Sequence, residues 1–266
     1  METESIKVAA FQFQGSGNIA NNLLAIERGI TEAARQKVRL LITQECALCG
    51  YPPVETESVD LIDFDSVNRA IAKIKQLAKT NNMYIALGTI KRSENNYLNS
   101  IEFITPDDEQ LLSYSKRALW GWDVQNYVPG NHPGIYVIDG FKIGIRICYE
   151  IRFPEYFREL FKENVDLALV SFCDIGEERQ VPKYELIKAH LITRAVENAM
   201  YVMSVNSISN YQLAPTCIIN PDGKVLQSAP SGEEYLLVYE VAKGPSNFGR
   251  DGRIKHSKEL CQMGQD

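Results

Sequence analysis

The chain has 266 residues, of which 45% are hydrophobic, with a net charge of −6 at pH 7 and six cysteines. This length suits one large α/β domain or two small ones, and the acidic balance argues against nucleic-acid binding. No apolar run approaches the roughly 20 residues of a membrane helix. Because Met-Glu-Thr-Glu at the start does not resemble a signal peptide, we expect a cytoplasmic protein with free thiols that binds no membrane.

The first third of the chain alternates strands with helices. Apolar periodicity predicts strands at 6–12, 38–43 and 84–90, and helices at 21–37 and 65–81. The strand at 38–43 is mostly apolar and runs into Gln44 and Glu45. Because an unpaired carboxylate is costly to bury, a glutamate at the end of an apolar strand indicates a functional site.

The middle of the chain predicts two hairpins. Strands at 98–105 and 111–114 flank the turn residues 106–108, and the second of them leads to Lys116. A hairpin at 135–147 turns at Asp139-Gly140 and runs directly into Cys148. A helix is then predicted from Pro154 to about residue 164, since proline suits the first turn of a helix.

The last third predicts a buried strand at 165–172 that ends at Cys173 and Asp174, and a helix at 182–200. Strands follow at 201–205, 216–219, 224–226 and 235–241, and a polar tail from Gly244 is expected to pack on a partner or to remain free. No linker or repeat divides the chain, so we predict a single domain over 1–266, with a core at about 5–242 and a tail at 243–266. Because several successive strands are linked by hairpins, the pattern favours two mixed β-sheets flanked by helices over one doubly wound sheet.

Three chemically useful side chains follow strand ends: Glu45, Lys116 and Cys148. A cysteine attacks a carbonyl carbon as a thiolate, so it needs a base or a nearby positive charge. No histidine lies near these motifs, and a partly buried glutamate has a pKa suited to the role of base. A lysine that faces the developing oxyanion stabilises a tetrahedral intermediate.

Simpler interpretations remain open for each residue alone. In the simplest interpretation, Cys148 is an inert core thiol, and Glu45 and Lys116 form an ion pair with a structural role only. Cys46 and Cys49 have the spacing of a redox or zinc motif, but no second pair accompanies them and the three histidines do not cluster. We therefore expect no zinc site and expect these two cysteines to flank the site without a disulfide.

Five segments together resemble the carbon–nitrogen hydrolase (nitrilase) superfamily, in its amidase-like branch. The segment Ile-Cys-Tyr-Glu-Ile-Arg-Phe-Pro-Glu at 147–155 is similar to the nucleophile motif of that family. Leu-Ile-Thr-Gln-Glu-Cys-Ala-Leu-Cys-Gly-Tyr at 41–51 resembles its glutamate motif, and Tyr-Ser-Lys-Arg-Ala-Leu-Trp-Gly at 114–121 its lysine motif. Residues 194–198 with Asn206, and Asn-Pro-Asp-Gly-Lys-Val at 220–225, resemble later family segments. Three catalytic motifs in the right order are far more specific than any one of them.

The resemblance implies a four-layer α-β-β-α sandwich that forms a homodimer or a higher homo-oligomer. It also implies hydrolysis of non-peptide carbon–nitrogen bonds in small amides, with water as second substrate and with neither a metal nor an organic cofactor. Glu45 would take the proton of Cys148, and Lys116 with the backbone N–H of Tyr149 would hold the oxyanion. An amine or ammonia would leave, and water would release the acid from a cysteine thioester.

Some positions depart from the family pattern. Gln44 replaces the proline that usually precedes the glutamate, and Ala118 stands where histidine is common. Many members carry a second glutamate after the lysine. Asp123 is expected at that position, with Gln125 as the alternative.

The substrate is poorly specified by the sequence. Arg152 could pair with a substrate carboxylate, which would favour ω-amides or N-carbamoyl compounds, or it could instead hold Glu150 or Glu155. Further pocket candidates are Tyr51, Trp120, Trp122, Cys173 and Asp174. Trp122 and Tyr127 could instead be ordinary aromatic residues of the core or of a dimer contact. The competing functions are a nitrilase acting on a small nitrile, an acyltransferase, and, from another class, a non-catalytic thiol redox sensor.

Overall fold

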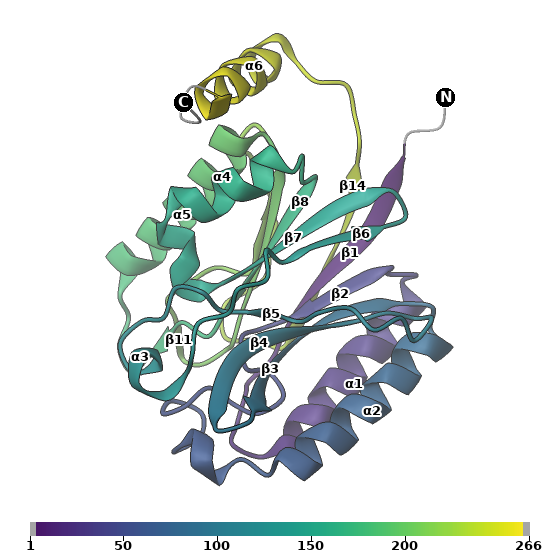
Figure 1. The fold of residues 1–266 in the computed structure, drawn as a ribbon, viewed down its shortest axis with the longest axis vertical. Helices are drawn as coiled ribbons and strands as arrows, with labels where there is room; N and C mark the ends of the chain where they lie inside the picture. The colour runs from purple at the N-terminus through teal and green to yellow at the C-terminus, as the bar shows by residue number, and fades with distance from the viewer. Residues whose placement is uncertain (1–3, 263–266) are drawn as a thin grey trace.

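The computed structural model describes residues 4–262 as four layers, with two sheets between two pairs of helices (Figure 1). This arrangement confirms the predicted α-β-β-α sandwich. Within the described residues, no helix is long and apolar enough to cross a membrane.

The first sheet has the strand order β14-β1-β2-β3-β4-β5. Its parallel centre is formed by β1, β2 and β3, and the remaining pairs are antiparallel. The bounds are β1 (Ser5–Gln12), β2 (Leu40–Thr43), β3 (Tyr84–Ser93), β4 (Asn96–Ile104), β5 (Tyr114–Ser115) and β14 (Tyr235–Ala242). Its outer face is covered by α1 (Ile19–Arg35) and α2 (Phe64–Thr80), whose first turns are capped by the side chains of Asn18 and Asp63.

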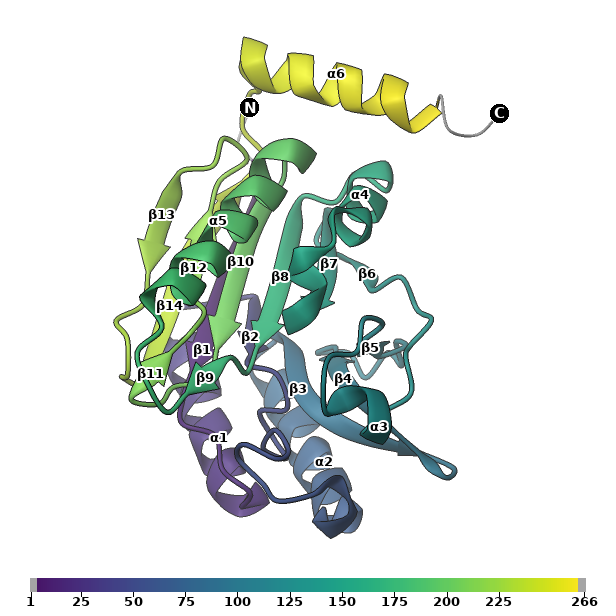
Figure 2. The ribbon, with the colours of Figure 1, turned by 90° about the vertical axis from the view of Figure 1, so that its left-hand side faces the viewer.

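The second sheet has the strand order β13-β12-β10-β8-β7-β6. Its bounds are β6 (Ile135–Ile138), β7 (Phe141–Ile147), β8 (Leu167–Phe172), β10 (Tyr201–Asn206), β12 (Cys217–Ile219) and β13 (Val225–Ser228). It is covered by α4 (Pro154–Lys162) and α5 (Val181–Asn198), as Figure 2 shows from the side. The hairpin predicted at 135–147 is present, and the predicted strands at 216–219 and 224–226 pair as the antiparallel strands β12 and β13.

Apolar side chains of the two sheets form one shared core between the inner layers. Ile143, Ile145 and Ile147 of β7 contribute to it from one side, and Val8 and Ala10 of β1 from the other. Alternate residues of a strand point to opposite faces, so this spacing of two residues fixes which side of each strand is buried.

The sheets also meet at the carboxyl ends of β2 and β8. The hydroxyl of Ser171 donates to the carbonyl of Thr43 at 3.0 Å, and the N–H of Glu45 donates to the carbonyl of Phe172 at 3.2 Å. The residues that follow β2 and β8 therefore lie close together.

The tail differs from the expectation that it packs on a partner or is free. It contains α6 (Phe248–Gln262), which lies across one end of the molecule (Figure 2). Arg250 and Arg253 both form ion pairs with Asp222, and Arg253 also donates to the carbonyl of Val196. The helix was missed because none of its residues is buried and so no apolar stripe marks it.

Several short elements were also absent from the prediction. They are η1 (Val59–Leu61), α3 (Asp123–Asn126), η2 (Cys148–Arg152) and a two-stranded ribbon of β9 (Ile175–Gly176) and β11 (Tyr211–Gln212). In place of a direct entry into the helix at Pro154, Cys148 begins the 3₁₀ turn η2.

Candidate active site

Glu45 is completely buried in the turn that follows β2. Its Oε1 accepts hydrogen bonds from Lys116 Nζ at 2.8 Å and from Asn99 Nδ2 at 2.7 Å, and its Oε2 accepts one from the N–H of Cys173 at 2.9 Å. Gly88 of β3 allows this turn to lie close, because a Cβ at Gly88 would come within 1.9 Å of the carbonyl oxygen of Gln44. The carboxylate is thus held from both sheets.

Lys116 lies immediately after β5 and is 2% exposed. Its ammonium contacts two carboxylates, Glu45 at 2.8 Å and Asp123 Oδ2 at 2.7 Å. The hydroxyl of Tyr51 donates to the other oxygen of Asp123 at 2.7 Å. The buried cluster therefore contains one cation between two carboxylates. The second carboxylate is that of Asp123, whereas Gln125, the alternative for this position, is exposed.

Cys148 lies at the junction between β7 and η2, and its thiol is partly buried. Its φ of +46° falls in the left-handed region, which is uncommon for a residue other than glycine. Backbone strain of this kind is concentrated at functional sites, where the surrounding contacts maintain it.

The charges in this cluster set the protonation of its members. Burial raises the pKa of Glu45, and Lys116 opposes only part of that rise. Burial and the charge of Glu45 also raise the pKa of the Cys148 thiol well above its usual value. Burial by itself lowers the pKa of Lys116, but the charges of Glu45, Cys148 and Asp123 outweigh it and keep the lysine protonated. These shifts favour a neutral thiol on Cys148 and increase the proton affinity of the Glu45 carboxylate.

The other predicted pocket residues lie in different environments. Cys173 is buried and binds Glu45 through its backbone N–H, and the carboxylate of Asp174 forms an ion pair with Lys183 at 2.6 Å. Trp120 is 59% exposed on the surface. Tyr149 is half-buried in η2, where its ring packs edge-on against Phe153.

Arg152 is half-buried and forms no ion pair among the described residues. The expected alternative, in which Arg152 holds Glu150 or Glu155, is therefore absent. Glu150 instead accepts hydrogen bonds from the backbone N–H groups of Ile147 and Arg117 and from the hydroxyl of Tyr114. The positive charge of Arg152 lies near His190, whose pKa is lowered mainly by burial, with smaller contributions from Arg194 and Arg152.

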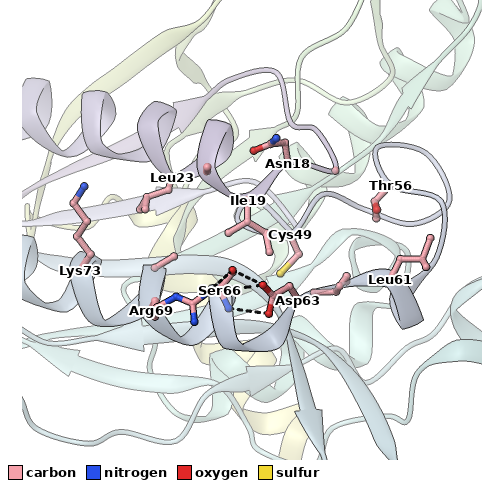
Figure 3. A pocket seen from close by; sticks show the side chains of 14 residues that line it. Asn18, Ile19, Leu23, Cys49, Thr56, Leu61, Asp63, Ser66, Arg69 and Lys73 are labelled. Carbon is pink, nitrogen blue, oxygen red and sulfur yellow. Dashed lines mark hydrogen bonds and ion pairs between the residues drawn. The ribbon is translucent and has the colours of Figure 1, made fainter.

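Cys46 and Cys49 are both buried free thiols, and the thiol of Cys49 lies 3.4 Å from the hydroxyl of Thr89. Cys49 also lines a cleft of about 520 Å³ between the N-terminal ends of α1 and α2 (Figure 3). The residues that line this cleft include none of the Glu45, Lys116 and Cys148 cluster.

Sequence reasoning missed Asn99 and Glu150. Asn99 is buried on β4 and donates to Glu45, and it is followed by Ser100, which is also buried. Two consecutive buried polar residues within an apolar strand were the available signal, because such groups need partners. Glu150 lies within the nucleophile motif, but nothing in the sequence indicated which groups it binds.

The sequence profile of the carbon–nitrogen hydrolase family matches residues 7–244. A 2-oxoglutaramate amidase of Bacillus subtilis (strain 168) is 28% identical over 239 residues, which cover 87% of this chain and 88% of the relative. A deaminated glutathione amidase of Dictyostelium discoideum is 25% identical over 257 residues, with 88% of this chain and 87% of the relative covered.

A solved structure of the NitN amidase from Neterenkonia sp. AN1 superposes with a TM-score of 0.81 at 21% identity, covering 97% of this chain and 99% of the other. A mutant of the Nesterenkonia sp. AN1 amidase has a TM-score of 0.82 at 20% identity, covering 98% and 97%. Its active-site cysteine carries the acetamide moiety of fluoroacetamide. The predicted family and fold are confirmed, and the chain belongs to the carbon–nitrogen hydrolase family.

Proposed function

We propose that the chain is an amidase that hydrolyses small non-peptide amides through a thioester on Cys148. The observation that carries this proposal is the buried Glu45 carboxylate, held by Lys116 and Asn99 on one oxygen and by the N–H of Cys173 on the other. A glutamate fixed in this way, with a raised pKa, suits a general base that serves a neutral thiol.

In the first half-reaction, Glu45 accepts the proton of Cys148 while the sulfur attacks the amide carbon. Lys116 and the backbone N–H of Tyr149 stabilise the negative charge that develops on the oxygen. The carbon–nitrogen bond then breaks, Glu45 returns its proton to the nitrogen, and ammonia or an amine leaves.

In the second half-reaction, Glu45 removes a proton from water, which attacks the thioester. The acid is released and the thiol is reprotonated, so the cycle needs neither a metal nor an organic cofactor. Asp123 acts as a positioning residue here, because it binds Lys116 and accepts from Tyr51.

The proposed substrate class is an ω-amide of a dicarboxylic acid, or an N-carbamoyl compound. The names of two relatives, 2-oxoglutaramate amidase and omega-amidase, support the first class. Tyr51, Trp120, Arg152, Cys173 and Asp174 remain the proposed pocket residues. Arg152, which has no carboxylate partner in the part of the chain that the structure describes, is the proposed contact for the substrate carboxylate.

We further propose that the chain folds as one domain and works in the cytoplasm as a homodimer. Val181 and Leu186 of α5, each 47% exposed, are apolar residues on an outer helix that would be buried in such a dimer.

The test is ammonia release from a panel of ω-amides, N-carbamoyl compounds and nitriles. Glu45→Gln, Lys116→Ala and Cys148→Ala are each expected to abolish release while the circular dichroism spectrum stays that of the wild type. Cys261→Ala, on α6, is the matched cysteine control and is expected to keep full activity. Turnover of amides by Cys148→Ala would refute the proposal, and turnover of nitriles alone would replace it with a nitrilase.

A further inference from the structure

We infer that Glu150 is a positioning residue whose buried carboxylate holds the segment carrying Lys116 against the turn carrying Cys148. The inference rests on the proposed function, since it concerns the same reaction. No step of that reaction assigns a role to Glu150, although it is fully buried next to the nucleophile.

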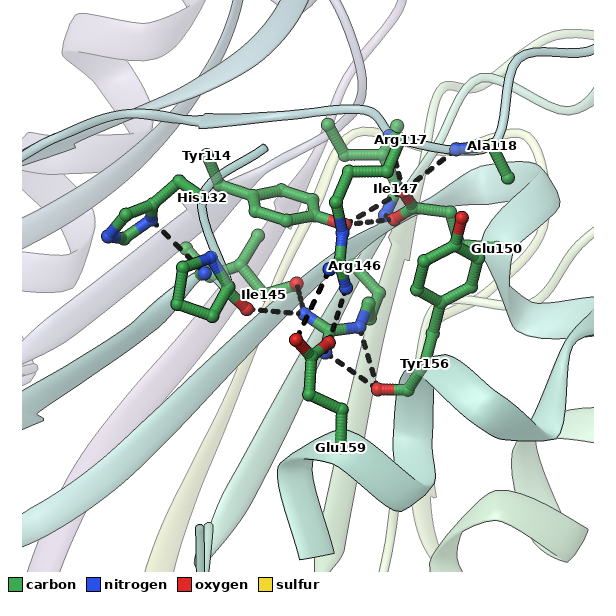
Figure 4. A network of polar contacts seen from close by, with 12 residues as sticks. Tyr114, Arg117, Ala118, His132, Ile145, Arg146, Ile147, Glu150, Tyr156 and Glu159 are labelled. Atoms are coloured by element: carbon green, nitrogen blue, oxygen red, sulfur yellow. Dashed lines mark hydrogen bonds and ion pairs between the residues drawn. The ribbon is translucent and has the colours of Figure 1, made fainter. Parts of the chain in front are cut away.

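Both oxygens of Glu150 are occupied by donors from two separate parts of the chain (Figure 4). Oε2 accepts from the N–H of Ile147 at 2.7 Å, within the nucleophile turn. Oε1 accepts from the N–H of Arg117 at 2.7 Å and of Ala118 at 3.3 Å, in the segment after β5. The hydroxyl of Tyr114 lies 2.7 Å from both oxygens.

These contacts link the two sheets at the site. Lys116 follows β5, an edge strand of the first sheet that pairs with β4 at two positions, whereas Cys148 follows β7 of the second sheet. Among the described residues, every hydrogen bond between 114–118 and 147–150 ends on the carboxylate of Glu150. Glu150 is therefore the one side chain that joins these two segments directly by hydrogen bonds, in addition to the contacts of Lys116 with Glu45 and Asp123.

Glu150 also maintains the strained turn of the nucleophile. Cys148 has a φ of +46°, and the hydrogen bond from the N–H of Ile147 to Glu150 closes the turn around it. Tyr149, whose N–H is the proposed oxyanion donor, lies between Cys148 and Glu150 in the chain. A change at Glu150 would thus move the nucleophile and the oxyanion donor together.

A neighbouring carboxylate provides a matched control. Glu159 of α4 forms ion pairs with Arg146 at 2.8 Å and with Arg117, in the same network (Figure 4). It bonds to side chains alone and to no backbone group of either segment. The side chain of Glu159 is 35% exposed, and Glu159→Gln weakens neighbouring ion pairs of the same network without releasing the turn.

The experiment compares Glu150→Gln, Tyr114→Phe and Glu159→Gln with the wild type. Glutamine keeps one acceptor oxygen but places an NH₂ group against the other backbone donors. We expect Glu150→Gln to lower kcat about 100-fold with KM changed less than about threefold, because a misplacement of about 1 Å has effects of that size. Tyr114→Phe, which removes a single donor, should lower kcat about three- to tenfold, and Glu159→Gln less than about threefold.

The alkylation rate of Cys148 by iodoacetamide, located by peptide mass mapping, is measured in the same variants. It should fall about tenfold in Glu150→Gln and less than about threefold in Glu159→Gln. This readout is independent of turnover, so absence of amide hydrolysis by the wild type would refute the proposed function and leave this inference testable.

The inference is overturned if folded Glu150→Gln keeps both rates within about threefold of the wild type, or if Glu159→Gln lowers them equally. If Glu150→Gln does not fold, Tyr114→Phe decides: unchanged kcat and alkylation overturn the inference, and a selective fall in kcat supports it.

Discussion

Lys116 neutralises two buried carboxylates, so its removal should affect stability as strongly as activity. Among the described residues, Lys116 is the one cation in contact with both Glu45 and Asp123, at 2.8 and 2.7 Å. Breaking a buried ion pair by deleting one partner typically destabilises a protein by about 3–5 kcal/mol, because the other charge stays buried and unpaired. We expect Lys116→Ala to lose about this amount, which is a large part of a total stability of about 5–15 kcal/mol.

The loss should depend on pH in a defined direction. Burial already raises the pKa of Glu45, and Lys116 opposes that rise, so the pKa of Glu45 rises further in Lys116→Ala. A carboxyl group whose pKa is higher in the folded than in the unfolded state weakens folding as pH increases above the unfolded value. The deficit of Lys116→Ala relative to the wild type should therefore be small near about pH 5 and largest near about pH 8.

Urea unfolding at about pH 5, 6.5 and 8 measures this difference for the wild type, Lys116→Ala and the double variant Lys116→Ala/Asp123→Asn. The double variant should recover part of the stability at high pH, since one of the two unpaired charges is gone, while both variants stay inactive. A Lys116→Ala protein as stable as the wild type at high pH, or a deficit independent of pH, would refute this account of the cluster.

Three further predictions concern the surroundings of Glu45. Gly88→Ala should destabilise the protein by more than about 2 kcal/mol in urea unfolding and lower activity, because its Cβ would meet the carbonyl of Gln44 at 1.9 Å. Gly244→Ala, with no atom within 4 Å of the added carbon, should change neither. Asn99→Ala removes a hydrogen-bond donor that lowers the pKa of Glu45. The ascending limb of the kcat/KM profile should therefore move to higher pH. An unchanged position of this limb would contradict the role of Glu45 as base. Tyr51→Phe leaves one oxygen of Asp123 without its donor and should cost about 1.5–3 kcal/mol of stability, with a lower kcat; unchanged stability and turnover would show that this hydrogen bond is dispensable.

The sequence grouped Glu45 and Lys116 as candidate catalytic residues because each of them follows an apolar strand, and the structure brings them to 2.8 Å. Strand ends are readable from local patterns, and the carboxyl ends of strands are where side chains from different parts of a chain meet. Asp123 was placed through the family resemblance, and the structure brings it to 2.7 Å from Lys116.

The hydrogen-bond partners of Asn99 and Glu150 could not be predicted, because they are set by the pairing of β4 with β5 and by the approach of two separate sheets. The 59% exposure of Trp120 could not be predicted either, since an aromatic side chain by itself does not reveal which way its loop turns. The helix α6 was missed for a related reason: it is held by ion pairs to Asp222, and a polar sequence without an apolar stripe carries no helical period.

The most direct test of the account is mass spectrometry of the acid-quenched enzyme during turnover of a small ω-amide. We expect a transient mass increase equal to the acyl group, mapped to the peptide that contains Cys148 and absent from Cys148→Ala. An adduct on Cys173 or another cysteine, or turnover in Cys148→Ala, would contradict it.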